Sequence, residues 1–170
     1  IEGMRRQDPP SIPQLALPVS VPIHAYKKAY ATTNHGLQAS ADLALIAFFY
    51  LLRVGEYTMP RFVKRNGKVQ RATRTVQFQV NNVGFYKSGK LLPRTAPLHF
   101  LLSANAATLK ITNQKNGHMG QTIHLETISK DHSPVKALAR RINHILKHRG
   151  TEDSLLYMYH NGTKLQVVTP

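Results

Sequence analysis

The sequence predicts an α+β domain, mostly helical with a small antiparallel sheet, within 170 residues. Three observations favour this fold class. The apolar run 43–52 has the composition of a buried helix. Residues 107–125 form two strand-like segments around a turn that contains glycine, the pattern of a β-hairpin. Residues 134–148 place apolar side chains on one face of a helix, which indicates a helix that packs on a core.

The N-terminal segment differs in composition from the rest. Residues 1–22 contain five prolines, which remove backbone donors and favour extended backbone. We therefore predict an arm or linker at 1–22 that precedes a domain at 23–170. A short helix is expected at 23–32. The helix with the apolar run is predicted at 37–57, and Ser40 is a candidate N-cap for a shorter version of it.

The middle of the chain is predicted to be partly irregular. Residues 61–74 hold six cations around an Asn-Gly pair and are expected to form a basic loop. Alternating apolar and polar residues predict a strand at 75–80, and a short strand is expected at 83–86. Pro93 and Pro97 argue against a regular strand at 91–106.

The last predicted helix has clear start and stop signals. Ser133 suits the N-cap and Pro134 suits the first helical position. Gly150 suits the stop, so we expect a helix at about 134–148. Residues 151–170 are rich in turn signals.

The charge of the chain is strongly positive and unevenly placed. Lys and Arg number 23 against 8 acidic residues, which gives a net charge of +15. Almost all of this excess lies in 61–170. A field of one sign favours a polyanion, so DNA or RNA is the expected partner. A well-solvated basic surface is the alternative interpretation.

Composition disfavours several other classes. The absence of Cys removes disulfides, thiolate metal sites and Cys nucleophiles. It fits an intracellular protein, nuclear if the source is eukaryotic. No segment has the roughly 20 apolar residues of a membrane span, and no phosphate loop or dinucleotide fingerprint is present. We therefore expect no membrane partner, no metal and no cofactor. The chain begins at Ile1, which suggests a piece of a longer protein.

Arg53 and Glu56 form the first candidate site. Arg53 follows the apolar run, where a guanidinium is costly to bury unless it is paired, and Glu56 lies one helical turn further on. An Arg held in this way can direct its planar fork at a phosphate. An ordinary salt bridge that closes the helix is the alternative.

Lys115 adds a second signal, because it lies where the first strand of the predicted hairpin enters the turn. The order of a buried helix, Arg53-x-x-Glu56 and a hairpin Lys resembles the catalytic domain of tyrosine recombinases, the phage-integrase family, over roughly residues 37–150. The sequence is especially similar to recombinase-like proteins of eukaryotic mobile elements. The resemblance implies the N-terminal half of that domain and a role in DNA recombination and integration.

The resemblance also assigns roles to these residues. Arg53 would stabilise charge on the phosphate, Glu56 would orient the site, and Lys115 would give a proton to the leaving oxygen. Other cations of the chain are expected to contact DNA, and these are Lys64, Arg65, Lys68, Arg71, Arg74, Lys87, Arg140 and Arg141. Active family members work as assemblies, so the resemblance also implies a homo-oligomer on DNA for the full-length protein.

The resemblance stops after the hairpin. The family site also needs a His-x-x-Arg pair and a nucleophilic Tyr, and no His in this chain has Arg three residues later. Tyr157 and Tyr159 precede the place where that pair should lie, so we interpret them as packing residues. His144 and His148 are interpreted as a solvent-facing pair on one helix.

The chain by itself is therefore expected to bind DNA weakly and to cleave nothing. Two alternatives stay open. One is a non-catalytic basic nucleic-acid-binding module derived from a mobile element. The other is a basic structural domain whose charge meets an acidic partner.

Overall fold

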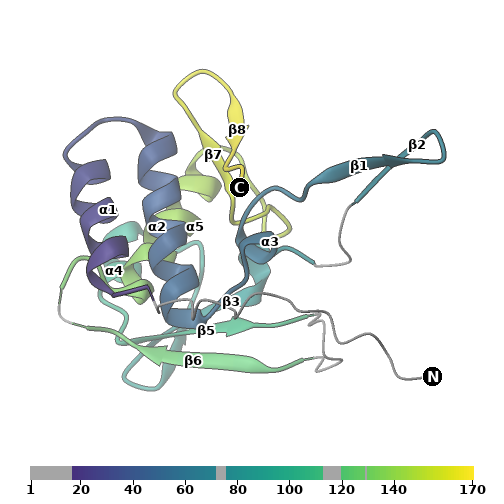
Figure 1. The fold of residues 1–170 in the computed structure, drawn as a ribbon. Helices are drawn as coiled ribbons and strands as arrows, with labels where there is room; N and C mark the ends of the chain where they lie inside the picture. Colours follow the sequence, from purple (N-terminus) through teal and green to yellow (C-terminus); the bar gives the residue numbers. More distant parts are fainter. Residues whose placement is uncertain (1–16, 72–75, 113–119, 129) are drawn as a thin grey trace, which may run out of the picture.

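A computed structural model describes residues 17–71, 76–112, 120–128 and 130–170 (Figure 1). Within these ranges the chain forms five α-helices, one short 3₁₀-helix and eight strands. The predicted α+β class is confirmed, but helices do not clearly dominate over strands. The predicted linker at 1–22 lies mostly outside the described residues.

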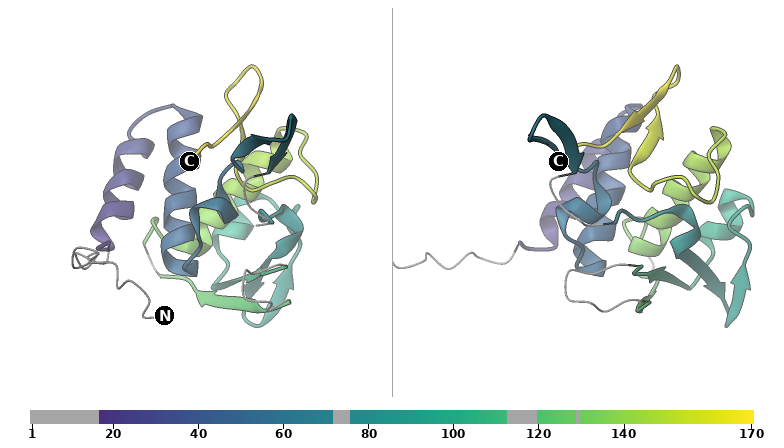
Figure 2. Two further views of the ribbon diagram at one scale, coloured as in Figure 1. Left: turned by 45° about the vertical axis from the view of Figure 1, so that its right-hand side comes forward. Right: turned by 90° about the vertical axis from the view of Figure 1, so that its right-hand side faces the viewer.

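The first two helices pack side by side (Figures 1 and 2). Helix α1 (Ser20–Tyr30) begins before residue 23, so the folded part starts inside the segment predicted as linker. Helix α2 (His35–Tyr50) is capped by Asn34, whose side chain accepts from two backbone N–H groups of the first turn. Ser40 is therefore not the N-cap, and its hydroxyl donates to a carbonyl within α2.

The helix predicted at 37–57 is divided in two. Helix α2 ends at Tyr50, because Leu51 adopts a left-handed conformation with φ of 55° and its N–H bonds back to the helix. A second short helix, α3 (Val54–Tyr57), then begins with Arg53 at its N-cap. Arg53 thus does not end the buried helix, as expected, but starts the turn that follows it.

A four-stranded antiparallel sheet lies against the helices. Its order is β4 (Lys90–Leu92), β3 (Val83–Lys87), β5 (Ala106–Lys110) and β6 (Thr122–Glu126). Strand β3 confirms the strand predicted at 83–86. Strands β5 and β6 pair in antiparallel register and confirm the predicted hairpin. Part of the connection between them, 113–119, lies outside the described residues.

The core lies between the helices and the sheet. Helix α5 (Pro134–Lys147) confirms the helix predicted at 134–148 and packs against α2, α4 (Leu98–Leu102) and the sheet. Most of the largest fully buried side chains come from these elements, among them Leu43, Leu45, Ile46, Tyr50, Phe85, Leu101, Leu109, Leu138 and Ile142. Because the core holds the end of α2 in place, it also fixes where the Arg53 turn emerges.

The described part of 61–74 is a hairpin and not the predicted loop. Strands β1 (Phe62–Arg65) and β2 (Lys68–Arg71) pair with each other and project away from the body (Figure 1). The loop prediction was wrong because it followed the run of cations. The Asn-Gly pair inside that run forms the hairpin turn.

The strand predicted at 75–80 is not formed over its described part. Phe78 and Val80 are buried, but their backbone groups bond to Glu56 and to residues 154–156, and a single bridge joins Gln79 to Leu155. The short 3₁₀-helix η1 (Val80–Asn82) follows. Alternation therefore marked Phe78 and Val80 as buried, but Val76 is 41% exposed and Gln77 is 3% exposed, so the period of two does not hold through the described part.

The C-terminal residues form a second small hairpin. Strands β7 (Met158–His160) and β8 (Leu165–Val167) pair in antiparallel register, and β7 contacts α2 and α5. In Figure 1 this hairpin stands beside the upper end of α2. None of the helices in the described ranges is long and apolar enough to span a bilayer.

Candidate nucleic-acid interface

The turn at Arg53 is held by the Glu56 side chain. The Glu56 carboxylate accepts from the Arg53 backbone N–H at 2.8 Å, as an acidic residue at the third helical position commonly does. Glu56 is 6% exposed, and its carboxylate lies 3.9 Å from the Arg53 guanidinium. Glu56 thus caps α3 through the backbone, and its ion pair with Arg53 is long.

The Arg53 side chain is open to solvent. Its side chain is 56% exposed, and Glu56 is its one ion-pair partner within the described ranges. Because α2 ends three residues earlier, Arg53 lies outside the core, and no guanidinium is buried here as the sequence had suggested. An exposed guanidinium on a fixed backbone keeps most of its donors free for an anion.

Hydrogen bonds tie this turn to the base of the β1–β2 hairpin. On the exit side, the Gly55 carbonyl accepts from Gln77 Nε2 at 3.0 Å, and the Glu56 carbonyl accepts from the Phe78 N–H at 3.2 Å. On the entry side, the Met59 N–H donates to the Val168 carbonyl at 2.9 Å. The hairpin therefore leaves the body next to Arg53, and both of its flanking segments are bonded to the body.

Residues 61–71, which we name the basic hairpin, carry the predicted DNA-contacting cations of this region. Lys64, Lys68 and Arg71 are exposed, and Arg65 stands opposite Lys68 beside the turn. At the base, Arg71 Nη1 lies 3.5 Å from the Gln77 amide oxygen. The basic hairpin thus concentrates positive charge on a projecting element.

Three other predicted site residues lie elsewhere. Arg74 and Lys115 are outside the described residues, so the predicted approach of Lys115 to Arg53 stays a prediction. Lys87 is exposed at the end of β3, and its Nζ donates to the Ser103 hydroxyl at 3.0 Å.

Arg140 is a structural residue and not the surface cation that was predicted. It forms an ion pair with Asp42 at 2.6 Å, and the two side chains are 15% and 2% exposed. Its guanidinium also lies over the rings of Tyr26 and Tyr30, and the Tyr30 hydroxyl donates to Asp42 at 2.6 Å. Burial raises the pKa of the Asp42 carboxyl, while the charge of Arg140 opposes that rise.

Arg141 is likewise structural. It is 3% exposed, and its guanidinium donates to the backbone carbonyls of Leu156 and Met158. The prediction failed for both arginines because Arg140 meets the Tyr26 and Tyr30 rings of α1 and Asp42 of α2, while Arg141 meets the segment that leads into β7. Positive charge on a helix does not by itself mark the solvent face.

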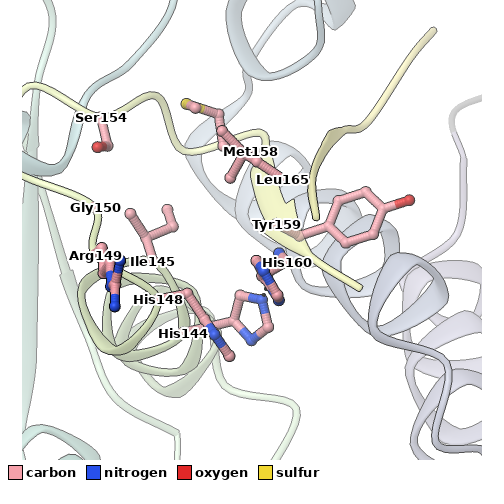
Figure 3. Close-up of a pocket in the computed structure, with 10 residues that line it drawn as sticks. All are labelled: His144, Ile145, His148, Arg149, Gly150, Ser154, Met158, Tyr159, His160 and Leu165. Carbon is pink, nitrogen blue, oxygen red and sulfur yellow. Dashed lines mark hydrogen bonds between the residues drawn. The ribbon is translucent and has the colours of Figure 1, made fainter. Parts of the chain in front are cut away.

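A cluster of histidines lies at the C-terminal end of α5 (Figure 3). Ring centroids are 5.3 Å apart for His35 and His144, 4.7 Å for His144 and His148, and 4.5 Å for His148 and His160. The His160 backbone N–H donates to His144 Nε2 at 2.9 Å. The interpretation of His144 and His148 as a solvent-facing pair is therefore wrong, because His144 is half-buried under β7.

The chemistry of this cluster follows from its surroundings. Burial, helped by the nearby Arg141 charge, lowers the pKa of His144 to about 4. Burial and the neighbouring His160 also lower the pKa of His148. The i, i+4 spacing of these two residues was visible in the sequence, but nothing there brought His35 and His160 to them. Among the described residues, no three His, Asp or Glu side chains are placed to hold a metal ion.

The two tyrosines after α5 serve packing. Tyr157 belongs to the core and is 7% exposed, and burial raises its pKa. Tyr159 is among the residues that line the pocket of about 160 Å³ beside the histidines, and its ring points away from them (Figure 3). Its hydroxyl lies so close to Gly36 that a Cβ there would be 2.8 Å away.

Comparisons with protein-family models, curated proteins and solved structures found no match to this chain. Its function must therefore be argued from the geometry above.

Proposed function

We propose that this chain binds double-stranded DNA and supplies the phosphate-contacting first half of a tyrosine recombinase-like catalytic domain. The observation that carries the proposal is the exposed Arg53 guanidinium on a turn fixed by Glu56, beside a hairpin of cations. A net charge of +15 supports a polyanionic partner.

The order of elements supports the recombinase part of the proposal. A buried helix leads to the Arg53 turn, an antiparallel sheet follows with the β5–β6 hairpin, and α5 comes next. In this proposal Lys115, on the connection between β5 and β6, acts as a general acid on the phosphate that Arg53 holds. The charged ends of the two side chains would then lie within about 10 Å of each other, which allows for loop closure on DNA.

A second candidate is a non-catalytic nucleic-acid-binding module. It is favoured by the position of Glu56, whose carboxylate caps α3 through a backbone N–H. Helix capping explains the Arg-x-x-Glu pattern without any chemistry on a phosphate.

Salt titration of a labelled DNA duplex tests the binding shared by both candidates. Affinity should fall steeply with salt, because each neutralised phosphate adds about −0.9 to the slope of log affinity against log salt. A flat salt response, or equal binding of an uncharged polymer, would contradict DNA as the partner.

Cleavage assays separate the two candidates. In a protein that joins this domain to the remaining catalytic residues, Arg53→Ala and Lys115→Ala should each abolish or severely slow strand cleavage. Both variants should keep most of the DNA affinity, since many other cations contact the backbone. A normal recombination rate for Arg53→Ala would leave only the non-catalytic module.

A further inference from the structure

We infer that the basic hairpin inserts its turn into the major groove of duplex DNA. The inference rests on the proposed DNA binding and adds which element enters the duplex and which groove it uses. Four features of residues 61–71 support it: charge, isolation, dimensions and placement.

The charge of the basic hairpin is of one sign. Its eleven residues include no acid and five cations, which are Arg61, Lys64, Arg65, Lys68 and Arg71. Among the described side chains, those of Arg61, Lys64, Lys68 and Arg71 take part in no ion pair. Cations without protein counter-ions are available to the phosphates on both walls of a groove.

The basic hairpin is isolated from the two other sheets. Strands β1 and β2 pair only with each other among the described strands. Phe62 and Val69 are 50% and 72% exposed, so the hairpin also offers apolar side chains to solvent. An unsupported two-stranded ribbon is marginally stable in water. Its exposed apolar residues therefore fit contact with a partner better than a role in the core.

The dimensions of the basic hairpin suit a groove. Strands of four residues extend about 14 Å at roughly 3.4 Å per residue. The major groove of B-form DNA is about 12 Å wide and 8.5 Å deep, and it admits a two-stranded ribbon. Asn66 and Gly67 have φ values of 50° and 75°, which gives the tight two-residue turn that such a narrow tip requires.

The placement of the basic hairpin is set by the Arg53 turn. The carbonyls of Gly55 and Glu56 bond to the segment that follows β2. A duplex whose phosphate lies on Arg53 would therefore meet the hairpin at a neighbouring part of its surface. Arg53 would hold the backbone, and the hairpin would hold the adjacent groove.

The experiment that tests groove insertion shortens the basic hairpin and leaves its base unchanged. Residues 64–69 are replaced by Asn-Gly, which removes two cross-strand pairs. Val63 then stands opposite Gln70 next to the new turn. Removing an even number of pairs preserves the alternation of hydrogen-bonded and non-hydrogen-bonded pairs. The shortened variant lacks Lys64, Arg65 and Lys68. The control variant carries Lys90→Gln, Lys147→Gln and Lys164→Gln, which remove the same charge from exposed positions on other elements.

The probe is a DNA duplex of about 30 base pairs, and a duplex RNA of the same sequence serves as a competitor. Dimethyl sulfate footprinting reports guanine N7 in the major groove and adenine N3 in the minor groove within one reaction. The double variant Lys64→Gln/Lys68→Gln in the full-length hairpin provides the same test if the shortened chain does not fold, which circular dichroism would show.

The unaltered chain should protect guanine N7, and it should prefer DNA because the deep, narrow major groove of duplex RNA excludes side chains. The shortened variant should lose that protection and bind at least about tenfold more weakly, with a salt slope lower by roughly 2 to 3. The control should lose affinity and keep N7 protection.

Two kinds of failure are distinguishable. If the unaltered chain binds DNA without N7 protection, if it binds duplex RNA equally well, or if the shortened variant keeps N7 protection, groove insertion is overturned while DNA binding stands. If the unaltered chain binds no duplex even at low salt, the proposed function itself fails, and the inference fails with it.

Discussion

At the scale of single residues, burial decides which cations are free for a partner. Arg53 and Arg140 each have one carboxylate partner among the described residues. The Arg53 side chain is 56% exposed with its partner at 3.9 Å, whereas the Arg140 side chain is 15% exposed with its partner at 2.6 Å. Local spacing predicted the first pair. The partner of Arg140 is 98 positions away, so the sequence could not reveal that pair.

The buried pair gives the first prediction at this scale. Arg140→Ala should lower the free energy of unfolding by about 3–5 kcal/mol, because Asp42 would stay buried without its counter-ion. Urea denaturation measures this change. Lys136→Gln, which breaks an exposed pair with Asp131, is the control and should barely move the midpoint. Equal effects of the two substitutions would contradict the structural role of Arg140.

The histidine cluster gives a pH prediction. The pKa of His144 is about 4 in the folded protein against an ordinary value of 6.5. As pH falls, the unfolded chain binds the proton first, so stability should be lost between about pH 6.5 and pH 4. We expect a loss on the order of 1 kcal/mol from His144, since solvent screens a half-exposed ring.

Urea midpoints from pH 4 to 7.5 measure this loss. His144→Gln should flatten the pH profile, while His24→Gln, at an exposed position on α1, should leave its shape unchanged. A His144→Gln profile as steep as that of the unaltered chain would show that other groups cause the pH dependence.

At the scale of elements, the sequence predicted those helices and strands whose formation depends on residues close together in the chain. The β5–β6 hairpin and α5 were predicted from strand patterning and from Ser133-Pro134, and both form. The predicted 37–57 helix failed at Leu51, whose left-handed conformation with φ of 55° is one that its residue type does not favour. The sequence therefore did not predict the turn at Arg53 or the exposure of its side chain.

The end of α5 allows a paired prediction. Arg149 is left-handed with φ of 65°, and the Gly150 N–H donates to the Ile145 carbonyl at 2.9 Å. A Cβ at Gly150 would lie 2.7 Å from that carbonyl oxygen. Arg149→Gly should therefore stabilise by up to about 1 kcal/mol, and Gly150→Ala should destabilise by roughly 1–3 kcal/mol. Urea denaturation gives the unfolding free energies of the two variants. A stabilising effect of Gly150→Ala would contradict the close approach of residue 150 to the Ile145 carbonyl.

At the scale of the whole molecule, the helices and the four-stranded sheet share one core, and the basic hairpin projects from it. Tyr30, Asp42 and Arg140 join α1, α2 and α5, and the core continues from these helices into the sheet. The basic hairpin is outside this core (Figure 2). The +15 charge predicted a polyanion but could not indicate where the charge gathers, because that depends on which cations the fold buries.

This division predicts a difference in hydrogen exchange. Amides of β1 and β2 should exchange well before those of β3 and β5, because the hairpin bonds have no buried apolar cover and open without global unfolding. Mass spectrometry of peptides covering 61–71 and 83–110 measures this directly. Similar protection of the two regions would contradict the isolation of the hairpin. Addition of duplex DNA should slow exchange in 61–71 if the groove inference holds.

The hydrogen bonds at the base of the basic hairpin have an entropic consequence. The Met59 and Phe78 N–H groups bond the segments on either side of the hairpin to the body, so its two attachment points are already placed before any partner arrives. A free loop of similar length would lose about 1–2 kcal/mol per residue in backbone entropy on capture. A paired ribbon held at both ends loses less backbone entropy than such a loop, and it also loses the rotamer freedom of its long cations, about 0.5–1.5 kcal/mol for each one immobilised. The basic hairpin can then bind duplex DNA through a small contact area, and its dissociation from the DNA can stay fast.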